Sequence, residues 1–437
     1  MSGARWGLRK TGSGPRVAVR ERLVLHLVVA RLVEVTLHRR LRRTPRPAPA
    51  QTRALKIVVL DAFRVDGTVR TILTLAADLS RNGWDVELIS VLRSAERPFF
   101  DIPAGVSVVV LDDRRPGHEG GVVRRALRSL RSVLLHLDDT AHMYWFTLWT
   151  DLQLLRHVRR LRRGVLITTR PAFNLFAARF APSEVLVIGQ EHMNLASHTE
   201  ELRLELGRRY PQLDALAVLS DADRAEYEGL LPARAPRIVQ IPNALPHLEG
   251  EPRAQREPIV LAAGRLRSQK GFDLLIEAFE PVAERFPDWQ LHIYGKGGRR
   301  AELEQLAQDR GLAGHVVIAD PTPHLGRRMA EVSIFALSSR YEGFGMVLVE
   351  AMSKGAAVVS FDCPRGPNEI ISDGVDGLLV APEDVPALSE ALIALIEDDA
   401  LRRRLGQAAV RTAQGYEPRA VGERWQRVIG ELLVARA

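Results

Sequence analysis

Two carboxylates that stand eight residues apart, Glu342 and Glu350, flank a glycine-containing turn in the second half of the chain. The turn is Gly343, Phe344 and Gly345, and the apolar run before it predicts a buried strand. The mostly apolar residues after it predict a helix. A strand, a tight glycine turn and a helix start form a place where backbone N–H groups and the helix dipole favour an anion.

Three further polar groups follow predicted strands in the same half of the chain. They are Gly264 and Arg265 with Lys270, the glycine turn 295–298, and the segment 365–369. In open α/β sheets, ligands bind beyond the carboxyl ends of the strands, so all these groups are expected at one edge. The two cations would neutralise a diphosphate, and the glycines of the central turn would let the backbone approach it. Together the groups suit a ligand made of phosphate and sugar.

Glu350 is the member of this set that is hardest to explain as a surface charge. Its neighbours on the predicted helix are almost all apolar, so the carboxylate is expected to be half-buried and to need a partner. Vicinal hydroxyl groups donate to a carboxylate, which suits a ribose. Taken alone, Arg265 and Lys270 are better explained as solvated charges, and the glycines at 295–298 as ordinary turn residues.

The first half of the chain offers weaker candidates. A loop around Gly67 follows an apolar strand, and His192 lies in the polar segment 190–194, directly after another strand. A lone histidine is more often structural, but two neighbours here can orient the ring, which makes a functional role at least as good an explanation. Arg170 and Asn174 are further candidates to line a cleft beside His192, although the sequence favours neither.

Length and composition predict a soluble enzyme of two domains. The chain has 437 residues, of which 46% are apolar and 6% aromatic, and this length is too great for one ordinary domain. Its single cysteine, Cys363, excludes an internal disulfide framework and a multi-cysteine metal cluster, and it favours the reducing cytoplasm. Because no histidine base stands near Cys363 in the sequence, we interpret it as a packed loop residue.

The net charge of +8 is concentrated at the start of the chain. Residues 1–56 carry a net charge of +12, so the remainder carries −4. A basic surface for nucleic acid would have to lie on the folded body, which is mildly acidic. We therefore predict no nucleic-acid partner.

The basic arm, residues 1–53, has two interpretations. Its middle, 23–37, is apolar but is interrupted by Arg31 and Glu34, so it predicts no transmembrane helix, and no small-residue cleavage site marks a signal peptide. The simpler interpretation is a disordered extension, or an upstream start codon that lengthens the true protein. The alternative is a basic amphipathic helix on an anionic membrane surface, which predicts peripheral contact with the inner face of the membrane.

Alternating apolar runs and helical periodicities predict two α/β domains, each with a Rossmann-like, doubly wound parallel sheet. We expect the first domain over 54–241, a linker rich in proline and glutamate over 242–257, and the second domain over 258–416. The last segment, 417–437, predicts a helix that can cross back to the first domain. Within the first domain, one helix is expected over 122–136.

Several stretches of the second domain together match a known family. They are Gly264-Arg265-Leu266 with Gln269-Lys270-Gly271, Ile293-Tyr294-Gly295-Lys296-Gly297, Glu342 and Glu350 with seven residues between, Ser360-Phe361-Asp362-Cys363-Pro364-Arg365-Gly366-Pro367-Asn368-Glu369, and Asp373-Gly374-Val375-Asp376-Gly377-Leu378-Leu379-Val380. With these motifs the chain resembles the retaining glycosyltransferases of family 4 (glycosyl transferases group 1), whose GT-B fold places two Rossmann-like domains on either side of a central cleft. The resemblance covers residues 56–435 and is strongest over 259–382.

The resemblance implies a role for each residue of the second domain that matches a family motif. Arg265 and Lys270 would hold the diphosphate of the donor, together with the backbone of Gly343, Phe344 and Gly345. Glu342 would lie by the donor sugar. Glu350 would bind the ribose of the nucleotide.

The resemblance is looser elsewhere. Gly67 stands where the family has a glycine loop that faces the donor phosphate and the acceptor, and His192 stands where it has a histidine near the reacting sugar. Gly295 and Asp320 would lie near the sugar or the base. The family often has glycine near position 320, and this departure leaves the identity of the base open.

A metal site is not predicted. Asp221 and Asp223 form an Asp-x-Asp pair, but they follow Ser220 at a predicted helix start, where helix capping and the dipole explain them better. No cofactor is expected beyond the donor substrate itself. A metal-dependent transferase of the other common fold is therefore disfavoured.

The resemblance implies transfer of a sugar from a nucleotide-diphosphate sugar to a hydroxyl acceptor, with retention of anomeric configuration. The acceptor stays open between a cell-envelope glycan, a polyol-phosphate polymer, a lipid and a small molecule, and so do the sugar and the base. Two alternatives remain. One is a GT-B phosphorylase, sugar-nucleotide hydrolase or epimerase, and the other is a non-catalytic nucleotide-sugar binding protein that the basic arm recruits to the membrane.

Overall fold

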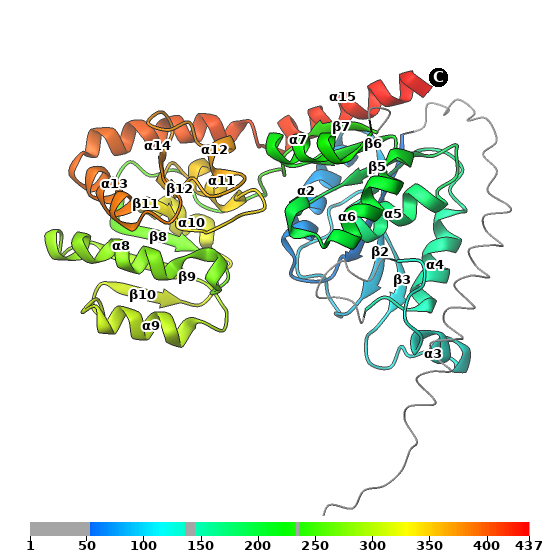
Figure 1. Ribbon diagram of the computed structural model, residues 1–437, viewed down its shortest axis with the longest axis horizontal. Coiled ribbons are helices and arrows are strands. Elements are labelled where there is room, and N and C mark those ends of the chain that lie inside the picture. Colours follow the sequence, from blue (N-terminus) through cyan, green and yellow to red (C-terminus); the bar gives the residue numbers. More distant parts are fainter. Residues whose placement is uncertain (1–52, 136–144, 233–235, 437) are drawn as a thin grey trace, which may run out of the picture.

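The computed structural model describes residues 53–135, 145–232 and 236–436. These residues form two α/β units, which lie side by side in Figure 1. Nearly all of the basic arm lies outside the described residues, so its two interpretations stay predictions.

The first unit is built on a seven-stranded parallel sheet with the order β3-β2-β1-β4-β5-β6-β7. Its strands are β1 (Ala54–Asp61), β2 (Asp85–Arg93), β3 (Val106–Asp113), β4 (Val165–Thr168), β5 (Leu186–Gln190), β6 (Ala215–Val218) and β7 (Arg237–Gln240). Its helices are α2 (Gly67–Arg81), α3 (Val122–Arg128), α4 (Leu148–Val158), α5 (Pro171–Phe180), α6 (Glu200–Arg209) and α7 (Asp221–Leu230).

Strand β1 shows why helices cover both faces of this sheet. Successive side chains of a strand point to opposite faces. Leu55 and Ile57 belong to the core that includes α2, whereas Val58 belongs to the core that includes α4, α5 and α6. The strand is apolar on both sides because both sides are buried, as expected for a parallel sheet.

The second unit repeats the plan with six parallel strands in the order β10-β9-β8-β11-β12-β13. The strands are β8 (Glu257–Ala263), β9 (Gln290–Tyr294), β10 (Val316–Ala319), β11 (Val332–Leu337), β12 (Ala357–Phe361) and β13 (Leu378–Val380). The helices are α8 (Phe272–Arg285), α9 (Arg300–Asp309), α10 (Leu325–Glu331), α11 (Met346–Ser353), α12 (Pro367–Ile370), α13 (Val385–Glu397) and α14 (Asp399–Gln414). The predicted pair of doubly wound parallel sheets is confirmed.

In each sheet the strand order reverses between two neighbours, β1 with β4 and β8 with β11. Connections run to opposite sides at such a switch point, which leaves a crevice beyond the carboxyl ends of the two strands. In the second unit, Gly264 follows β8 and Glu342 follows β11, so both lie beyond strands that meet at this point. The fold thus brings together two of the groups that the sequence analysis singled out.

The prediction of one helix over 122–136 is wrong in its extent. Helix α3 ends at Arg128, and a turn follows it. The buried carboxylate of Asp151 accepts bonds from the N–H groups of Val133 and Leu134, at 2.6 and 3.0 Å, and from Ser132 Oγ at 2.6 Å. These amides therefore bond to a side chain in α4 instead of to a preceding helical turn. Position 136 lies outside the described residues.

The last helix, α15 (Pro418–Arg436), follows α14 of the second unit but packs on the first. In Figure 1 it extends in red over the first sheet. Trp425 and Ile429 belong to the same apolar core as α2 and β1. Near its end, Arg436 Nη2 contacts both carboxylate oxygens of Asp214, at 2.5 and 2.6 Å. The chain therefore links the two units twice, through residues 241–256 and through α15.

Removing the Trp425 side chain tests this packing. The indole is 1% exposed, and truncation of a buried tryptophan to alanine costs about 3–5 kcal/mol. We expect Trp425→Ala to lower the free energy of unfolding by that amount in urea titrations followed by circular dichroism. Arg427→Ala, at an exposed position of the same helix, is the matched control and should change stability by less than about 0.5 kcal/mol. Equal stability of the two variants would contradict the docking of α15.

Candidate active site

The turn between β11 and α11 is held by close backbone contacts. Gly345 precedes α11 with a φ of 90°, a left-handed conformation that favours glycine. Phe344 is buried, and Gly366 lies so close that an added Cβ would sit 1.8 Å from the Phe344 carbonyl oxygen. The first-turn N–H groups of a helix lack acceptors within the helix, so the start of α11 suits an anion, although the Leu348 N–H already donates to the Gly345 carbonyl oxygen at 2.8 Å.

Lys270 and Glu342 meet directly beside this turn. Lys270 Nζ donates to Glu342 Oε1 at 2.6 Å, and Ser339 Oγ donates to the same oxygen at 2.6 Å. The two charged side chains are 13% and 7% exposed. An ammonium group has three donors, and this bond uses one of them, so Lys270 can still contact a phosphate. The structure therefore adds a partner that the sequence analysis did not assign to either residue.

The approach of these segments depends on Gly271. Its φ is 59°, and an added Cβ would lie 1.9 Å from the carbonyl oxygen of Ser338. Lys270 also packs over Gly264, where an added Cβ would be 3.1 Å from Lys270 Cε. The loops after β8 and β11 are therefore pressed together, and this contact brings Lys270 to Glu342.

Arg265 extends from the same loop as an exposed side chain. Among the residues that the structure describes, it forms no ion pair. Gly295 supports this loop from behind, because an added Cβ there would lie 2.1 Å from the Gly264 carbonyl oxygen. Asp320 is 86% exposed and pairs with Arg300 at 2.7 Å. Arg300 also reaches the Gly295 carbonyl oxygen at 3.3 Å, so the two predicted positions near the sugar or base share one arginine.

Glu350 lies one turn into α11 and contacts the other unit. Its Oε1 is 3.2 Å from Arg70 Nη1, which extends from the first turn of α2. Burial raises the pKa of the Glu350 carboxyl, and the nearby Arg70 guanidinium opposes that shift. The partner that a half-buried carboxylate was expected to need is therefore Arg70. The sequence contains no signal for this residue beyond its place three residues after Gly67.

The first unit supplies a small cavity of about 70 Å³ at the carboxyl ends of β1 and β5. Asp66, Thr68, Arg170 and His192 are among the residues that line it. Asp66 caps α2 by accepting from the Thr68 N–H at 2.7 Å. An added Cβ at Gly67 would meet nothing within 4 Å, so the loop is open on that side.

His192 lines this cavity with both ring nitrogens shielded from solvent and, within the described part of the chain, without a hydrogen-bond partner. Burial lowers the pKa of the imidazole to about 4, with Asp66 raising it and Arg170 lowering it further. The ring is therefore neutral at neutral pH. A neutral imidazole with two unpaired nitrogens can donate one hydrogen bond and accept another.

The predicted halves of the site lie against each other. Asn194 Nδ2 donates to the Glu342 carbonyl oxygen at 2.8 Å, and an added Cβ at Gly343 would lie 3.5 Å from the His192 carbonyl oxygen. The segment after β5 thus touches the turn before α11. Asn174 does not line the cavity; it is buried and donates to Glu191 Oε1 at 2.8 Å. Arg170 does line it.

The segment 365–369 joins the units instead of presenting its charges to the turn. Arg365 pairs with Glu226 and lies 3.5 Å from Asp223 Oδ1, both on α7. The Glu369 carboxylate accepts from the N–H groups of Asp221 and Ala222, at 2.7 and 3.2 Å. Both charges thus have partners across the interface, and the place of this segment in a phosphate and sugar site stays a prediction.

Ser220 caps α7 by accepting from the Asp223 N–H at 3.0 Å, which confirms the capping interpretation of that helix start.

Cys363 is fully buried, as interpreted, and burial raises the pKa of its thiol to about 12. In the described residues, no group of three or more histidine, cysteine, aspartate and glutamate side chains is placed to hold a metal ion. The helices of that same part of the chain include none long and apolar enough to cross a membrane.

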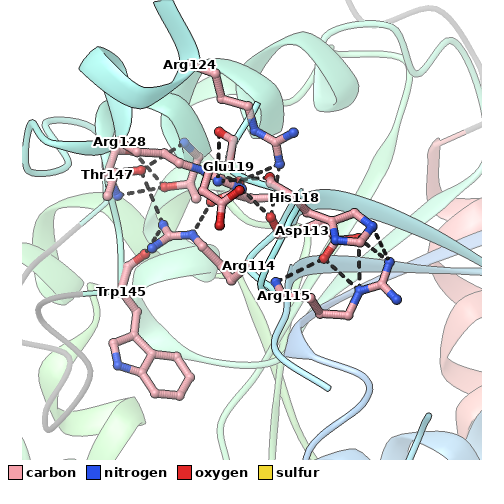
Figure 2. Close-up of polar contacts among 11 residues, drawn as sticks. Asp113, Arg114, Arg115, His118, Glu119, Arg124, Arg128, Trp145 and Thr147 are labelled. Atoms are coloured by element: carbon pink, nitrogen blue, oxygen red, sulfur yellow. Dashed lines mark hydrogen bonds and ion pairs between the residues drawn. The ribbon is translucent and has the colours of Figure 1, made fainter. Parts of the chain in front are cut away.

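Several arginine side chains cluster at the end of β3 in the first unit, and Figure 2 shows their contacts. Buried Asp112, at the end of β3, pairs with Arg114, Arg124 and Arg128. Arg114 Nη2 also donates to the carbonyl oxygen of Trp145 at 2.9 Å. The Trp145 ring in turn lies 4.2 Å from the guanidinium of Arg64, in the loop that leads to Gly67. This cluster therefore connects β3 and α3 to the loop before α2.

This chain is similar in sequence to a family of known proteins. Residues 247–412 match the family Glycosyl transferases group 1. The chain is 34% identical over 382 residues to an exopolysaccharide phosphotransferase of Streptomyces coelicolor. The matched region covers 85% of this chain but only 40% of that relative's length. It is 23% identical over 375 residues to an uncharacterized glycosyltransferase of Haemophilus influenzae, covering 85% of this chain and 98% of the relative.

Among solved structures, the pneumococcal O-GlcNAc transferase in complex with UDP and GlcNAc superposes with a TM-score of 0.67. The identity is 15%, and the match covers 88% of this chain and all of that one. The two sheets and their order define a protein of the GT-B fold, which confirms the predicted fold class. Residues 247–412 belong to the glycosyl transferases group 1 family.

The buried state of His192 predicts a pH dependence of stability. Its folded pKa of about 4 lies below the ordinary value of 6.5, so the unfolded chain binds a proton first as the pH falls. The part of the free energy of unfolding that comes from burying neutral His192 is fully present above pH 6.5. Up to about 3 kcal/mol of it is lost as the pH falls toward 4. We expect urea titrations to show that the free energy of unfolding differs less between pH 7 and pH 4.5 in His192→Asn than in the native protein. His247→Asn, at an exposed position in the segment that joins the units, is the control and should leave the difference unchanged. An unaltered difference in His192→Asn would contradict this burial.

Proposed function

We propose that the protein transfers a sugar from a nucleotide-diphosphate sugar to a hydroxyl acceptor, with retention of configuration at the anomeric carbon. The observation that carries the proposal is the Lys270–Glu342 pair at the start of α11, with the His192 segment packed against the same turn. A cation, a helix start and a carboxylate stand together there. They suit a ligand with a diphosphate at one end and hydroxyl groups at the other.

The diphosphate is the leaving group in this reaction. The bond between the anomeric carbon and the phosphate oxygen breaks, and a bond between that carbon and the acceptor oxygen forms on the same face. The acceptor proton passes to an oxygen of the departing phosphate. Lys270, Arg265 and the backbone of Gly343 to Gly345 stabilise the negative charge that develops there, and preorganised groups of this kind are the main electrostatic contribution to catalysis.

The carboxylates and the histidine have separate roles in the proposal. Glu342 contacts the donor sugar and keeps Lys270 beside the turn. Glu350 accepts hydrogen bonds from the ribose hydroxyls. Neutral His192 hydrogen-bonds to the sugar next to the reacting carbon, and Gly67 leaves space between the phosphate and the acceptor. Gly295 and Asp320 lie toward the base or the sugar.

The donor base and the acceptor are inferred from similar proteins. The structurally similar pneumococcal enzyme was solved with UDP, so UDP is the first nucleotide to test. The Streptomyces relative acts on an exopolysaccharide by its name, which favours a cell-envelope or extracellular glycan as acceptor. The protein requires no cofactor in this proposal. Cytoplasmic location, with membrane contact through residues 1–53, stays a prediction.

That relative's name also supports a second candidate, transfer of a sugar phosphate instead of a sugar. The chain spans 40% of the relative, so the named activity belongs to a much longer protein. The two reactions release different nucleotides. Sugar transfer releases the nucleoside diphosphate, whereas sugar-phosphate transfer releases the nucleoside monophosphate, so chromatography of the reaction products decides between them.

A ligand panel tests the donor site. Thermal-shift measurements would compare UDP, GDP and ADP, each with its glucose and N-acetylglucosamine derivatives. We expect one nucleotide to raise the melting temperature, because a ligand that binds only the folded state stabilises it, and Arg265→Ala to remove most of this shift. Arg310→Ala, which removes a surface cation of the same unit, is the control and should keep the shift. The absence of a shift with every panel member would overturn the proposed function.

A further inference from the structure

The contact between Arg70 and Glu350 joins two elements that both belong to the proposed donor site. Arg70 Nη1 and Glu350 Oε1 are 3.2 Å apart, although the residues are 280 positions apart in the chain. Arg70 lies on the first turn of α2, three residues after Gly67. Glu350 lies on α11, four residues after its first residue, Met346. The starts of both helices therefore lie close to this pair.

The pair occupies the carboxylate that the proposed function gives to the ribose. The Glu350 side chain is 11% exposed, and it has little contact with water to replace a lost partner. Burial raises the pKa of this carboxyl, and Arg70 is the cation that acts against that shift. A ribose hydroxyl that takes the place of Arg70 on Glu350 separates the guanidinium from its anion, and the partly exposed guanidinium then favours another anionic partner.

Such an anion is within reach when a nucleotide diphosphate is bound. Four residues of helix rise by about 6 Å, so Glu350 stands about 6 Å along α11 from the helix start that would hold the phosphates. An arginine side chain can cover a distance of this order by changing rotamers. Its planar guanidinium also forms paired hydrogen bonds with phosphate oxygens. Arg70 is 32% exposed, which leaves its side chain room to move.

We propose that Arg70 is a donor-binding residue that exchanges partners. In the absence of donor it pairs with Glu350 and links the two units across the cleft. When the nucleotide binds, the ribose hydroxyls take Glu350 and Arg70 passes to the diphosphate. The first unit then contacts the donor directly, so the donor replaces the ion pair as the link between the units. This inference rests on the proposed function, since it requires Glu350 to bind ribose.

The exchange makes opposite predictions for ligands with and without phosphates. A nucleoside competes with Arg70 for Glu350 and offers the guanidinium nothing in return, whereas a nucleoside diphosphate gains Arg70 as a partner. Removing Arg70 should therefore strengthen nucleoside binding and weaken nucleoside diphosphate binding. A purely structural role for Arg70 would change both affinities in the same direction.

The test is calorimetric titration of the full-length protein with UDP, GDP and ADP and with uridine, guanosine and adenosine. For the base that binds the native protein, Arg70→Ala should weaken diphosphate binding by about 10- to 100-fold, the size expected for a charged hydrogen bond. It should tighten binding of the parent nucleoside several-fold, and this gain should vanish in the Glu350→Gln background, where the ion pair is already lost. Arg81→Ala, an exposed position on the same helix, should change neither affinity.

Each other outcome is decisive. Equal losses for the diphosphate and the nucleoside in Arg70→Ala, or unchanged affinities for both, would overturn the exchange while leaving the proposed function intact. Failure of the native protein to bind any of the six compounds would instead overturn the proposed function. If Arg70→Ala lowers the melting temperature, Arg70→Lys keeps the charge but loses the planar fork, and it should still show the loss of diphosphate binding.

Discussion

The candidate site depends on one electrostatic constraint: carboxylates on a largely apolar turn and helix must have cationic partners. Glu342 and Glu350 are 7% and 11% exposed, and α11 carries buried apolar residues around them. An unpaired buried charge is strongly destabilising. Lys270 pairs with the first carboxylate and Arg70 with the second. Two cations are therefore held near the helix start, and in our proposals they are the ones that contact the donor diphosphate.

The same constraint governs how the two units meet. Several links between them are polar: Arg70 with Glu350, Asn194 with the Glu342 carbonyl, Arg365 with α7, and Glu369 with the start of α7. Polar contacts between domains can exchange partners at lower cost than an apolar interface can separate. By contrast, α15 fixes the first unit through a buried tryptophan. The chain thus combines a buried apolar attachment through α15 with several polar contacts between the units.

The fold could be predicted from the sequence because its signals are local. The apolar run before the turn at Gly343 to Gly345 forms β11 and the mostly apolar residues after it form α11, as the sequence indicates, and the glycine turns mark the carboxyl ends where ligands bind. The site partners could not be predicted, because Lys270 and Glu342 are 72 residues apart and Arg70 and Glu350 are 280 apart. The helix expected over 122–136 ended early for the same reason: the competing acceptor, Asp151, belongs to a different element. The partners of Arg365 also could not be predicted, because they lie in the other unit.

The central claim is that Glu342 serves the reacting sugar and not the nucleotide, and the most direct measurement is of turnover and donor affinity in Glu342→Gln. The amide keeps the size of the side chain and a hydrogen-bond acceptor for Lys270 and Ser339, but it removes the negative charge. We predict a loss of turnover of about 100-fold or more, the effect typical of removing a group that acts on the transition state, with the dissociation constant of the nucleoside diphosphate almost unchanged. Native turnover in this variant, or a loss of nucleotide affinity equal to the loss of turnover, would contradict the account.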